Sequence, residues 1–348
     1  MADRGKQAGD DLAVGMHLDR VLDRSGKRRD LRDQGSQHSD QRADALALGF
    51  GFELTDLVGT FGEAGGGTGG LETGLAFELG ALVVEGGGFS NSITQYDSFE
   101  SGAWFDASDL PDFRFTLEDF RATYVGPEEA GNLGEPRSFE ADVQITTPGQ
   151  EQETRTVQVN KPLHVDGASM YLLGNGYAPT LTIRDAAGEV VYSESQPFLP
   201  QDSNMTSLGI IKIPDGLPEQ VGLVGFFYPT QGVLPSGAFT SVYPDVINPV
   251  LTLNVFSGDL GIDDGTPRSV YTLEVDGLTQ HTGGDTAADS LELTPGATVD
   301  LPNGWGTITW EEVTAEEPVK RFASLQIRRD PSSGWVLMFS VLATLGLF

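Results

Sequence analysis

The chain has 348 residues, with 51 acidic and 21 basic side chains, no cysteine and a formal net charge of −30. This length allows two ordinary domains or one large all-β domain. The charge excludes nucleic acid as a partner, because phosphate backbones are bound by surplus lysine and arginine. The lack of cysteine excludes disulfide scaffolds, thiolate metal sites, thiol nucleophiles and haem attachment through cysteine.

The N-terminal part of the chain differs in composition from the rest. The first 90 residues lack proline, isoleucine, tyrosine, tryptophan and asparagine, whereas all 19 prolines lie from Pro111 onward. Residues 1–45 carry nine Lys/Arg and nine Asp, so the whole charge of −30 lies on residues 46–348. The polar run from Asp19 to Asp44 has neither a helical nor a strand period. We predict that residues 1–80 are a disordered or out-of-frame arm without a function of their own.

Residues 81–333 are predicted to form a mainly β domain of antiparallel sheets, sandwich- or barrel-like. Apolar and polar residues alternate along many segments, which is the period of a half-buried antiparallel strand. Turn dipeptides such as Asp166-Gly167 separate them. Helical periodicity is limited to short pieces around Asp119 and Asp285–Ser290. The predicted strands are Leu82–Glu85, Phe113–Tyr124, Ser138–Thr146, Thr154–Val159, Ser169–Leu173, Thr180–Asp185, Val190–Ser195, Leu208–Ile213, Val221–Tyr228, Val250–Phe256, Val270–Val275, Thr298–Leu301, Gly306–Val313 and Ala323–Arg328.

An uncharged run, Gly334–Phe348, follows the β domain. A membrane-spanning helix needs about 20 apolar residues, which is more than this run contains. We predict that residues 334–348 are the start of a C-terminal transmembrane helix, the alternative being a buried core helix. Trp335 stands at its beginning, where an aromatic belt at the membrane interface would place it.

The residues point to no catalytic centre and no metal site. HExxH, GxSxG and P-loop motifs are absent, and the surroundings of the carboxylates mark out no catalytic pair. His17 and His38 lie in the arm, while His164 and His281 are far apart and are more typical of surface or hydrogen-bonded histidines than of ligands. The loop Asp259–Gly265 has the carboxylate density of a calcium site but not the EF-hand order of ligands, which favours a solvated turn.

The segment Val157–Pro179 reads Val-Gln-Val-Asn-Lys-Pro-Leu-His-Val-Asp-Gly-Ala-Ser-Met-Tyr-Leu-Leu-Gly-Asn-Gly-Tyr-Ala-Pro. It resembles the signature block of the ResB-like family of cytochrome c biogenesis proteins, in which Val-Asn-x-Pro-Leu precedes a glycine turn, an aromatic strand and Gly-Tyr-x-Pro. The matching residues are Asn160, Pro162, Gly167, Tyr171, Gly176, Tyr177 and Pro179. Further segments agree in the same order, over about three quarters of the chain: Glu85–Phe105, Phe115–Phe120, Pro197–Asp202, Phe239–Thr252 and Phe322–Pro331.

This resemblance implies a membrane-tethered component of the cytochrome c maturation machinery. ResB-like proteins carry three membrane helices, a large extracytoplasmic domain and a last membrane helix. With a ResC/CcsA-type membrane protein they move haem across the cell membrane to apocytochrome c for covalent attachment. Residues 81–333 would be the extracytoplasmic domain, with haem handled as cargo and not tightly bound. Residues 1–80 stand in place of the N-terminal helices, so the haem ligands of those helices carry over to no residue here.

The resemblance also suggests roles for single residues. His164, Tyr171 and Tyr177 are the weak candidates for contact with haem. An aromatic ledge of Tyr171, Tyr177, Phe226, Phe227 and Tyr228 could support a flat apolar ligand, or these side chains could simply be core. The block Asn160–Pro162 with Gly167 is interpreted as a turn in which Pro162 sets φ and Asn160 precedes it in an extended conformation.

Two other classes of function stay open. A secreted or surface β-rich binding or adhesion module would use exposed Trp104, Trp305 and Trp310, with calcium at Asp259–Asp264 as an optional addition. A glycosidase-like enzyme on a β scaffold has the least support, because no carboxylate pair is marked out.

Overall fold

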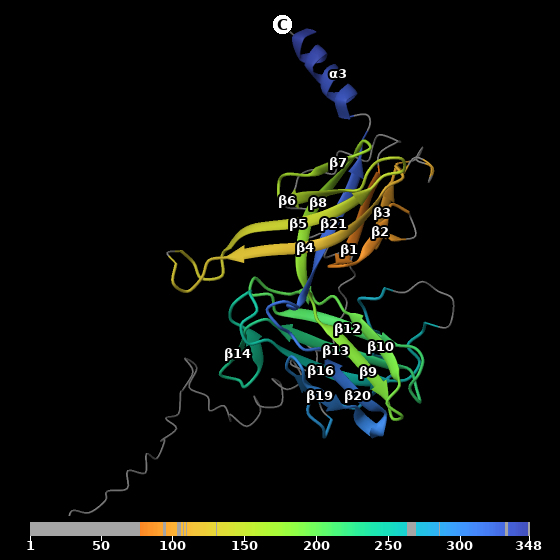
Figure 1. Cartoon of the computed structure of the whole chain (residues 1–348), viewed down its shortest axis with the longest axis vertical. Coiled ribbons are helices and arrows are strands. Elements are labelled where there is room, and N and C mark those ends of the chain that lie inside the picture. Colours follow the sequence, from red (N-terminus) through yellow and green to blue (C-terminus); the bar gives the residue numbers. More distant parts are fainter. Residues whose placement is uncertain are drawn as a thin grey trace, which may run out of the picture. The chain divides into compact units, whose positions relative to one another are not determined.

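The computed structural model describes residues 77–346, except 93–94, 103–105, 107, 109, 130, 263–268, 285 and 331–332. The described part is mainly β, with antiparallel sheets and a helix at its C-terminal end (Figure 1). This confirms the predicted fold class. The strands enclose two separate clusters of buried apolar side chains.

Two sheets surround the first core, which includes Leu79, Phe115, Leu117, Val143 and Ile327. One sheet has the strand order β3-β1-β21-β8-β7 and the other β2-β4-β5-β6. Along β4 and β5 the alternation of apolar and polar residues turns one face of the hairpin inward. The bounds are β1 (Phe77–Val84), β2 (Gly88–Ser90), β3 (Ser98–Ser101), β4 (Arg114–Tyr124), β5 (Pro136–Thr146), β6 (Glu153–Gln158), β7 (Leu163–Val165), β8 (Ala168–Ala178) and β21 (Lys320–Arg329).

Two further sheets and a small hairpin surround the second core. Their orders are β10-β9-β20-β19 and β11-β12-β13-β16-β17, with β18 paired to β16, while β14 and β15 pair with each other. The bounds are β9 (Thr180–Asp185), β10 (Val190–Ser195), β11 (Leu199–Pro200), β12 (Ser207–Ile213), β13 (Val221–Tyr228), β14 (Gln231–Val233), β15 (Phe239–Ser241), β16 (Val250–Ser257), β17 (Thr279–Gln280), β18 (Leu291–Leu293), β19 (Thr298–Asp300) and β20 (Gly306–Trp310), with a 3-10 turn, η4 (Pro302–Gly304), before β20.

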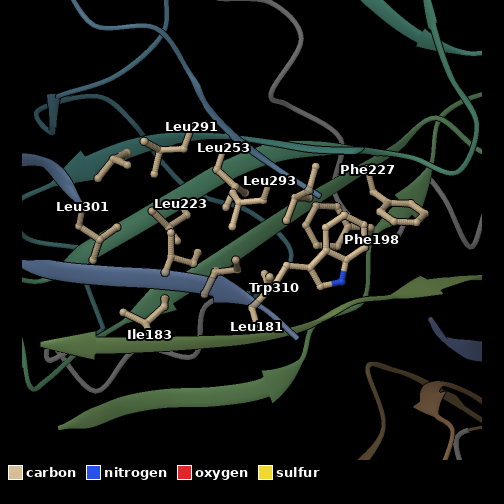
Figure 2. Packing of buried hydrophobic residues seen from close by; sticks show 14 of the residues in the cluster. Leu181, Ile183, Phe198, Leu223, Phe227, Leu253, Leu291, Leu293, Leu301 and Trp310 are labelled. Atoms are coloured by element: carbon tan, nitrogen blue, oxygen red, sulfur yellow. The ribbon is translucent and has the colours of Figure 1, made fainter. Parts of the chain in front are cut away.

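The second core is built around aromatic side chains. Figure 2 shows Trp310, Phe227 and Phe198 close together, with leucines from β9, β13, β16 and β18 beside them. The Phe227 ring meets Trp310 edge-on at 5.8 Å between centroids, and Phe198 lies 6.3 Å from Phe227. Such edge and tilted contacts stabilise aromatic pairs beyond the area they bury.

Strand β8 contributes to both cores, and it is paired along its length with β21 (Figure 1). Met170 and Leu172 of β8 pack in the first core, whereas Tyr177, near the end of the same strand, packs in the second. The register shifts between Ser324 and Leu325 of β21, which marks a bulge. These two strands therefore join the two sets of sheets.

Most predicted strands are confirmed, and three have the predicted bounds: β9, β10 and β13. The Asp166-Gly167 turn joins β7 to β8, and its φ angles of 46° and 79° are those of a type I′ hairpin. The prediction of a strand at Val270–Val275 is wrong, because this segment is a loop whose Leu273 is buried against another sheet face. The suggested helix at Asp119 is also wrong, because this residue lies within β4.

The C-terminal helix, α3 (Ser333–Gly346), has 14 residues and follows β21 closely. Several of its large apolar side chains are exposed, among them Trp335, Leu337, Phe339 and Leu345. In the described part of the chain, no helix combines the length and the apolar character needed to cross a membrane. At the other end, β1 begins at Phe77, within the predicted arm, whereas residues 1–76 lie outside the described residues.

Candidate functional site

The signature block Val157–Pro179 runs from the end of β6 through β7 to the end of β8. Its first turn is closed by the Lys161 N–H, which donates to the Gln158 carbonyl at 3.0 Å. Asn160 has a φ of 62°, so the interpretation of an extended Asn160 is wrong. The third position of this turn needs a left-handed residue, a conformation that asparagine tolerates better than most side chains.

Half of the remaining motif positions lie on the β7–β8 hairpin or directly before it. Gly167 is exposed, Pro162 and Tyr171 are half-buried, and His164 is exposed. The His164 Nδ1 atom lies 2.8 Å from the Ser169 hydroxyl across the hairpin. His164 and Tyr171 lie on the same hairpin, whereas Tyr177 packs in the second core.

The last motif residues lie where β8 enters the second core. Gly176 is buried beside the Phe322 ring and the Phe198 carbonyl, and a side-chain carbon at this position would overlap both. Phe198 is enclosed from another side by Gly209, where an added carbon would overlap its ring. Two glycines therefore form a slot for Phe198, whose N–H donates to the Tyr177 carbonyl at 2.9 Å.

A buried polar cluster, here called the junction, surrounds Tyr177. Arg321 is 9% exposed, and its Nη2 atom donates to the Tyr177 hydroxyl at 2.6 Å and to Asp245 Oδ1 at 2.9 Å. The Tyr177 hydroxyl donates to the Pro244 carbonyl at 2.9 Å. The junction thus ties β8, β21 and the loop after β15 together with charge-assisted hydrogen bonds.

Glu85 links the junction to the first core. Its two carboxylate oxygens accept the backbone N–H groups of Phe120 and Arg321, each at 2.7 Å. Burial raises the pKa of Glu85 above its ordinary value, although these two hydrogen bonds oppose the shift. One carboxylate therefore holds β4 and β21 at the point where β1 ends.

Three buried polar atoms at or near the junction have no hydrogen-bond partner among the described residues: Tyr124 Oη, Arg321 Nη1 and Asn175 Oδ1. Burial raises the pKa of both Tyr124 and Tyr177, so both phenols are protonated at neutral pH. Arginine stays charged at every ordinary pH. The junction can therefore orient and bind groups, but its phenols and guanidinium are poor proton acceptors near neutral pH.

The other described histidine, His281, is half-buried and contacts the second core. His281 Nε2 lies 2.9 Å from the Ser257 hydroxyl, and its Nδ1 lies 3.3 Å from the Asn303 amide nitrogen. Its ring meets Trp305 edge-on at 4.9 Å. With both ring nitrogens engaged, His281 is a hydrogen-bonded structural residue in this conformation.

The predicted aromatic surfaces are largely internal. Trp305 and Trp310 are buried, so neither is an exposed binding residue of the kind an adhesion module would use, and Trp104 lies outside the described residues. In the predicted ledge, Tyr177, Phe227 and Tyr228 are buried, and Phe226 is 37% exposed.

The acidic loop is only partly described. Asp259 Oδ1 accepts the Gly261 N–H at 2.8 Å, as in a local turn, while Asp263 and Asp264 lie outside the described residues. Within the described ranges, no group of three or more histidine and carboxylate side chains is placed to hold a metal ion.

The junction could be predicted from the sequence only in part. Tyr177 belongs to the signature block, but Arg321, Asp245 and Glu85 were not among the candidate residues. The sequence signal for Arg321 is its place in the alternation of the strand. It is an even number of positions from Ala323, Leu325 and Ile327, which all point inward. No local pattern identifies Asp245 as the partner of a cation 76 residues away.

These observations define an antiparallel β protein with two cores joined by a buried Arg-Tyr-Asp junction. The segments that carry the resemblance, far apart in sequence, supply or adjoin this junction through Glu85, Phe120, Tyr177, Phe198 and Asp245, and Arg321 directly precedes the last of these segments. A family model described as the ResB-like family matches residues 49–348, and the chain belongs to this family. The match begins within the predicted arm, at residue 49.

Membership of this family indicates a role in cytochrome c biogenesis, in a family whose members are typically membrane-associated. Neither a curated protein nor a solved structure matches the chain.

Proposed function

We propose that the chain is a membrane-tethered, non-catalytic component of the cytochrome c maturation machinery. In this proposal the β domain lies on the extracytoplasmic side of the cell membrane. Together with a ResC/CcsA-type membrane partner it positions haem and apocytochrome c for covalent attachment. Haem is cargo, passed on by this domain and not tightly bound.

The observation that carries this proposal is the junction. Segments of the family resemblance, together with Arg321, meet at a buried contact that joins the two cores. Buried charge-assisted hydrogen bonds hold neighbouring elements in one arrangement. A rigid two-core scaffold is suited to holding two partners in register, which is a positional role.

The C-terminal helix supports the proposed tether. It carries exposed apolar side chains, including Trp335 and Phe339, and α3 begins four positions after β21 ends at Arg329. Three or four extended residues reach only about 10–14 Å. A helix anchored in a membrane would therefore hold the β domain against the membrane surface.

Lengthening the tether tests the proposal. A Gly/Ser linker of about 20 residues inserted after Pro331 would let the domain move by roughly 25 Å. In a strain that depends on an intact version of this protein, covalent haem in cytochrome c should fall while the level of the protein stays normal. Haem staining of membrane proteins and an immunoblot measure the two quantities.

The matched control is the same linker inserted after Gly149, in the exposed turn between β5 and β6. This insertion lengthens the chain without moving the β domain away from α3, so maturation should persist. Normal maturation with the linker after Pro331 would show that close tethering is irrelevant, and the positional mechanism would be abandoned.

A further inference from the structure

Exposed apolar side chains gather on the second set of sheets near the junction. Phe226, Val233, Leu234, Val242 and Ile247, here called the apolar patch, are each between 37% and 66% exposed. They come from β13, the β14–β15 hairpin and the loop that follows it. Apart from α3, the other large apolar side chains of this exposure in the described part belong to four separate segments: Leu133, Val159, Val190 and Val270.

A chain of ring contacts connects the patch along one side. Phe226 stacks on Tyr228 at 6.3 Å between centroids, and Tyr228 meets Phe239 edge-on at 6.0 Å. Phe239 is the cross-strand partner of Val233 in the hairpin. Directly opposed residues of antiparallel strands have side chains in contact, so packed rings link Phe226 to Val233 through the buried Tyr228.

The loop after β15 places the rest of the patch beside the same hairpin. The Val242 N–H donates to the Thr230 carbonyl at 2.9 Å, and the Ile247 N–H donates to the Pro229 carbonyl at 3.1 Å. Between them, Asp245 is held by Arg321 in the junction. The contact that joins the two cores thus also positions Val242 and Ile247.

The sheet face beneath Phe226 forms an open row. Leu208, Phe226, Thr252 and Glu292 are successive cross-strand partners on β12, β13, β16 and β18. The neighbouring row of the same sheet face is covered. Val224 and its β12 partner Ile210 are buried against Leu260 and Leu273 of the loop after β16. The open row is half-buried at Leu208 and ends at the exposed carboxylate of Glu292.

The charge around the patch is strongly one-sided. Residues 180–319, which contain strands β9 to β20, carry 20 acidic side chains and three basic ones, Arg184, Lys212 and Arg268. Lys212 donates to the Ser269 carbonyl at 2.9 Å. An anionic membrane or a second copy of this chain would be repelled, whereas a cationic partner would be attracted. Residues 1–45 have no net charge, so charge does not favour them as the occupant.

We propose that the apolar patch and the open row bind a cationic polypeptide segment. The segment would seat an aliphatic or aromatic side chain beside Phe226 and place lysine or arginine near Glu292. This inference deepens the proposed function, since it gives the polypeptide substrate a place on the chain, and it rests on that function only for its biological role.

Peptide binding to the full chain tests the inference. The probe is a fluorescein-labelled peptide with Lys-Lys-Leu-Trp-Leu-Lys-Lys at its centre, and fluorescence anisotropy gives its Kd. The double variant Val233→Ser, Ile247→Ser should weaken binding about tenfold, because two exposed apolar anchors are lost. Raising the salt from about 50 to about 200 mM should also weaken it, since screening reduces the attraction.

The matched control is Val190→Ser, which removes an apolar side chain of 48% exposure from β10 in the same acidic stretch. Its Kd should equal that of the wild type. An equal loss with Val190→Ser, an unchanged double variant, or equal binding of a peptide with glutamate in place of lysine would overturn the inference. Dimerisation of the chain, or its binding to vesicles of anionic phospholipid, would also overturn the inference if the double variant abolished it.

The outcome for the peptide is separable from the outcome for the proposed function. Peptide binding is measured on the isolated chain, whereas the linker after Pro331 is tested by maturation in cells. Patch-dependent binding with a failed linker test keeps the docking surface and rejects the positional mechanism. A successful linker test without patch-dependent binding rejects the docking surface alone.

Discussion

The guanidinium of Arg321 covers the ring of Tyr177, with its central carbon 4.2 Å from the ring centroid, although 144 positions separate the two residues. Tyr177 stands near the end of β8 and Arg321 near the start of β21. A cation over an aromatic face is attracted most strongly when water is excluded. Since Asp245 supplies the counter-charge, this contact couples the stability of the two cores.

Replacing Arg321 by alanine should destabilise the protein by about 2–4 kcal/mol, because the buried partners of the guanidinium lose their hydrogen bonds. Urea unfolding followed by tryptophan fluorescence measures the change. The control is Arg121→Ala: this guanidinium pairs with Asp142 at 2.6 Å and with Glu140 at 3.3 Å, but its side chain is 44% exposed. An exposed pair contributes under about 1 kcal/mol. Equal losses in both variants would contradict the assigned role of Arg321.

Adding one methyl group at Gly176 should be costly, since it would overlap the Phe322 ring and the Phe198 carbonyl. We expect Gly176→Ala to lower the free energy of unfolding by about 1–3 kcal/mol. Gly174→Ala is the control on the same strand, where the nearest atom outside the chain neighbours would be 3.7 Å away, on Ser324. If both variants unfold at the same urea concentration, the slot around Phe198 is less tightly packed than described.

The stability of the protein should depend on pH through Glu85. Its pKa is raised in the folded state above the ordinary value of 4.5, chiefly by burial. Its contribution is therefore fully present below the unfolded pKa and is lost as the pH rises through the folded pKa. Relative to Glu85→Gln, the wild type should lose unfolding free energy as the pH rises above about 4.5. If the unfolding free energy of the wild type instead rose with pH relative to that of Glu85→Gln, the assigned pKa shift of Glu85 would be refuted.

The isolated chain should bind haem weakly or not at all. Neither described histidine is arranged as a ligand, because His164 lies beside Ser169 and both ring nitrogens of His281 are engaged. Titration with haemin should leave the Soret band close to that of free haemin. A sharp low-spin Soret band that disappears in His164→Ala or His281→Ala would show that one of these residues is an axial ligand.

Much of the fold could be predicted from the sequence because alternation is local. The strands Thr180–Asp185 and Val221–Tyr228 have the predicted bounds, since each alternates or is buried as a whole and ends at turn residues. In contrast, β8 was predicted to end at Leu173. It continues to Ala178 because Gly176 is required by a close tertiary approach, which overrides its weak strand propensity.

The junction was less accessible to sequence reasoning. The signature block pointed to Tyr177, but its partners stand at separations that no periodicity reports. The prediction of a strand at Val270–Val275 was wrong for a different reason, because there a local pattern was present but misleading. The alternating apolar residues of this segment are those of a strand, but Leu273 packs over Gly222 on a sheet face as part of a covering loop. Burial without backbone pairing gives the same sequence signal as a strand.

The pairing of β1 with β21 determines the order in which the chain can fold during synthesis. Phe77 pairs with Arg329, so the first sheet cannot close until Arg329 has left the ribosome. The strands β9 to β20 are continuous in sequence, form most of the second core and lie between β8 and β21 in the chain. We therefore expect the strands β9 to β20 to fold first, while β1, which can already pair with β3, leaves its other edge unpaired. Long-range strand pairing of this kind is slow and leaves an aggregation-prone edge exposed, which makes the nascent protein a natural client for chaperones.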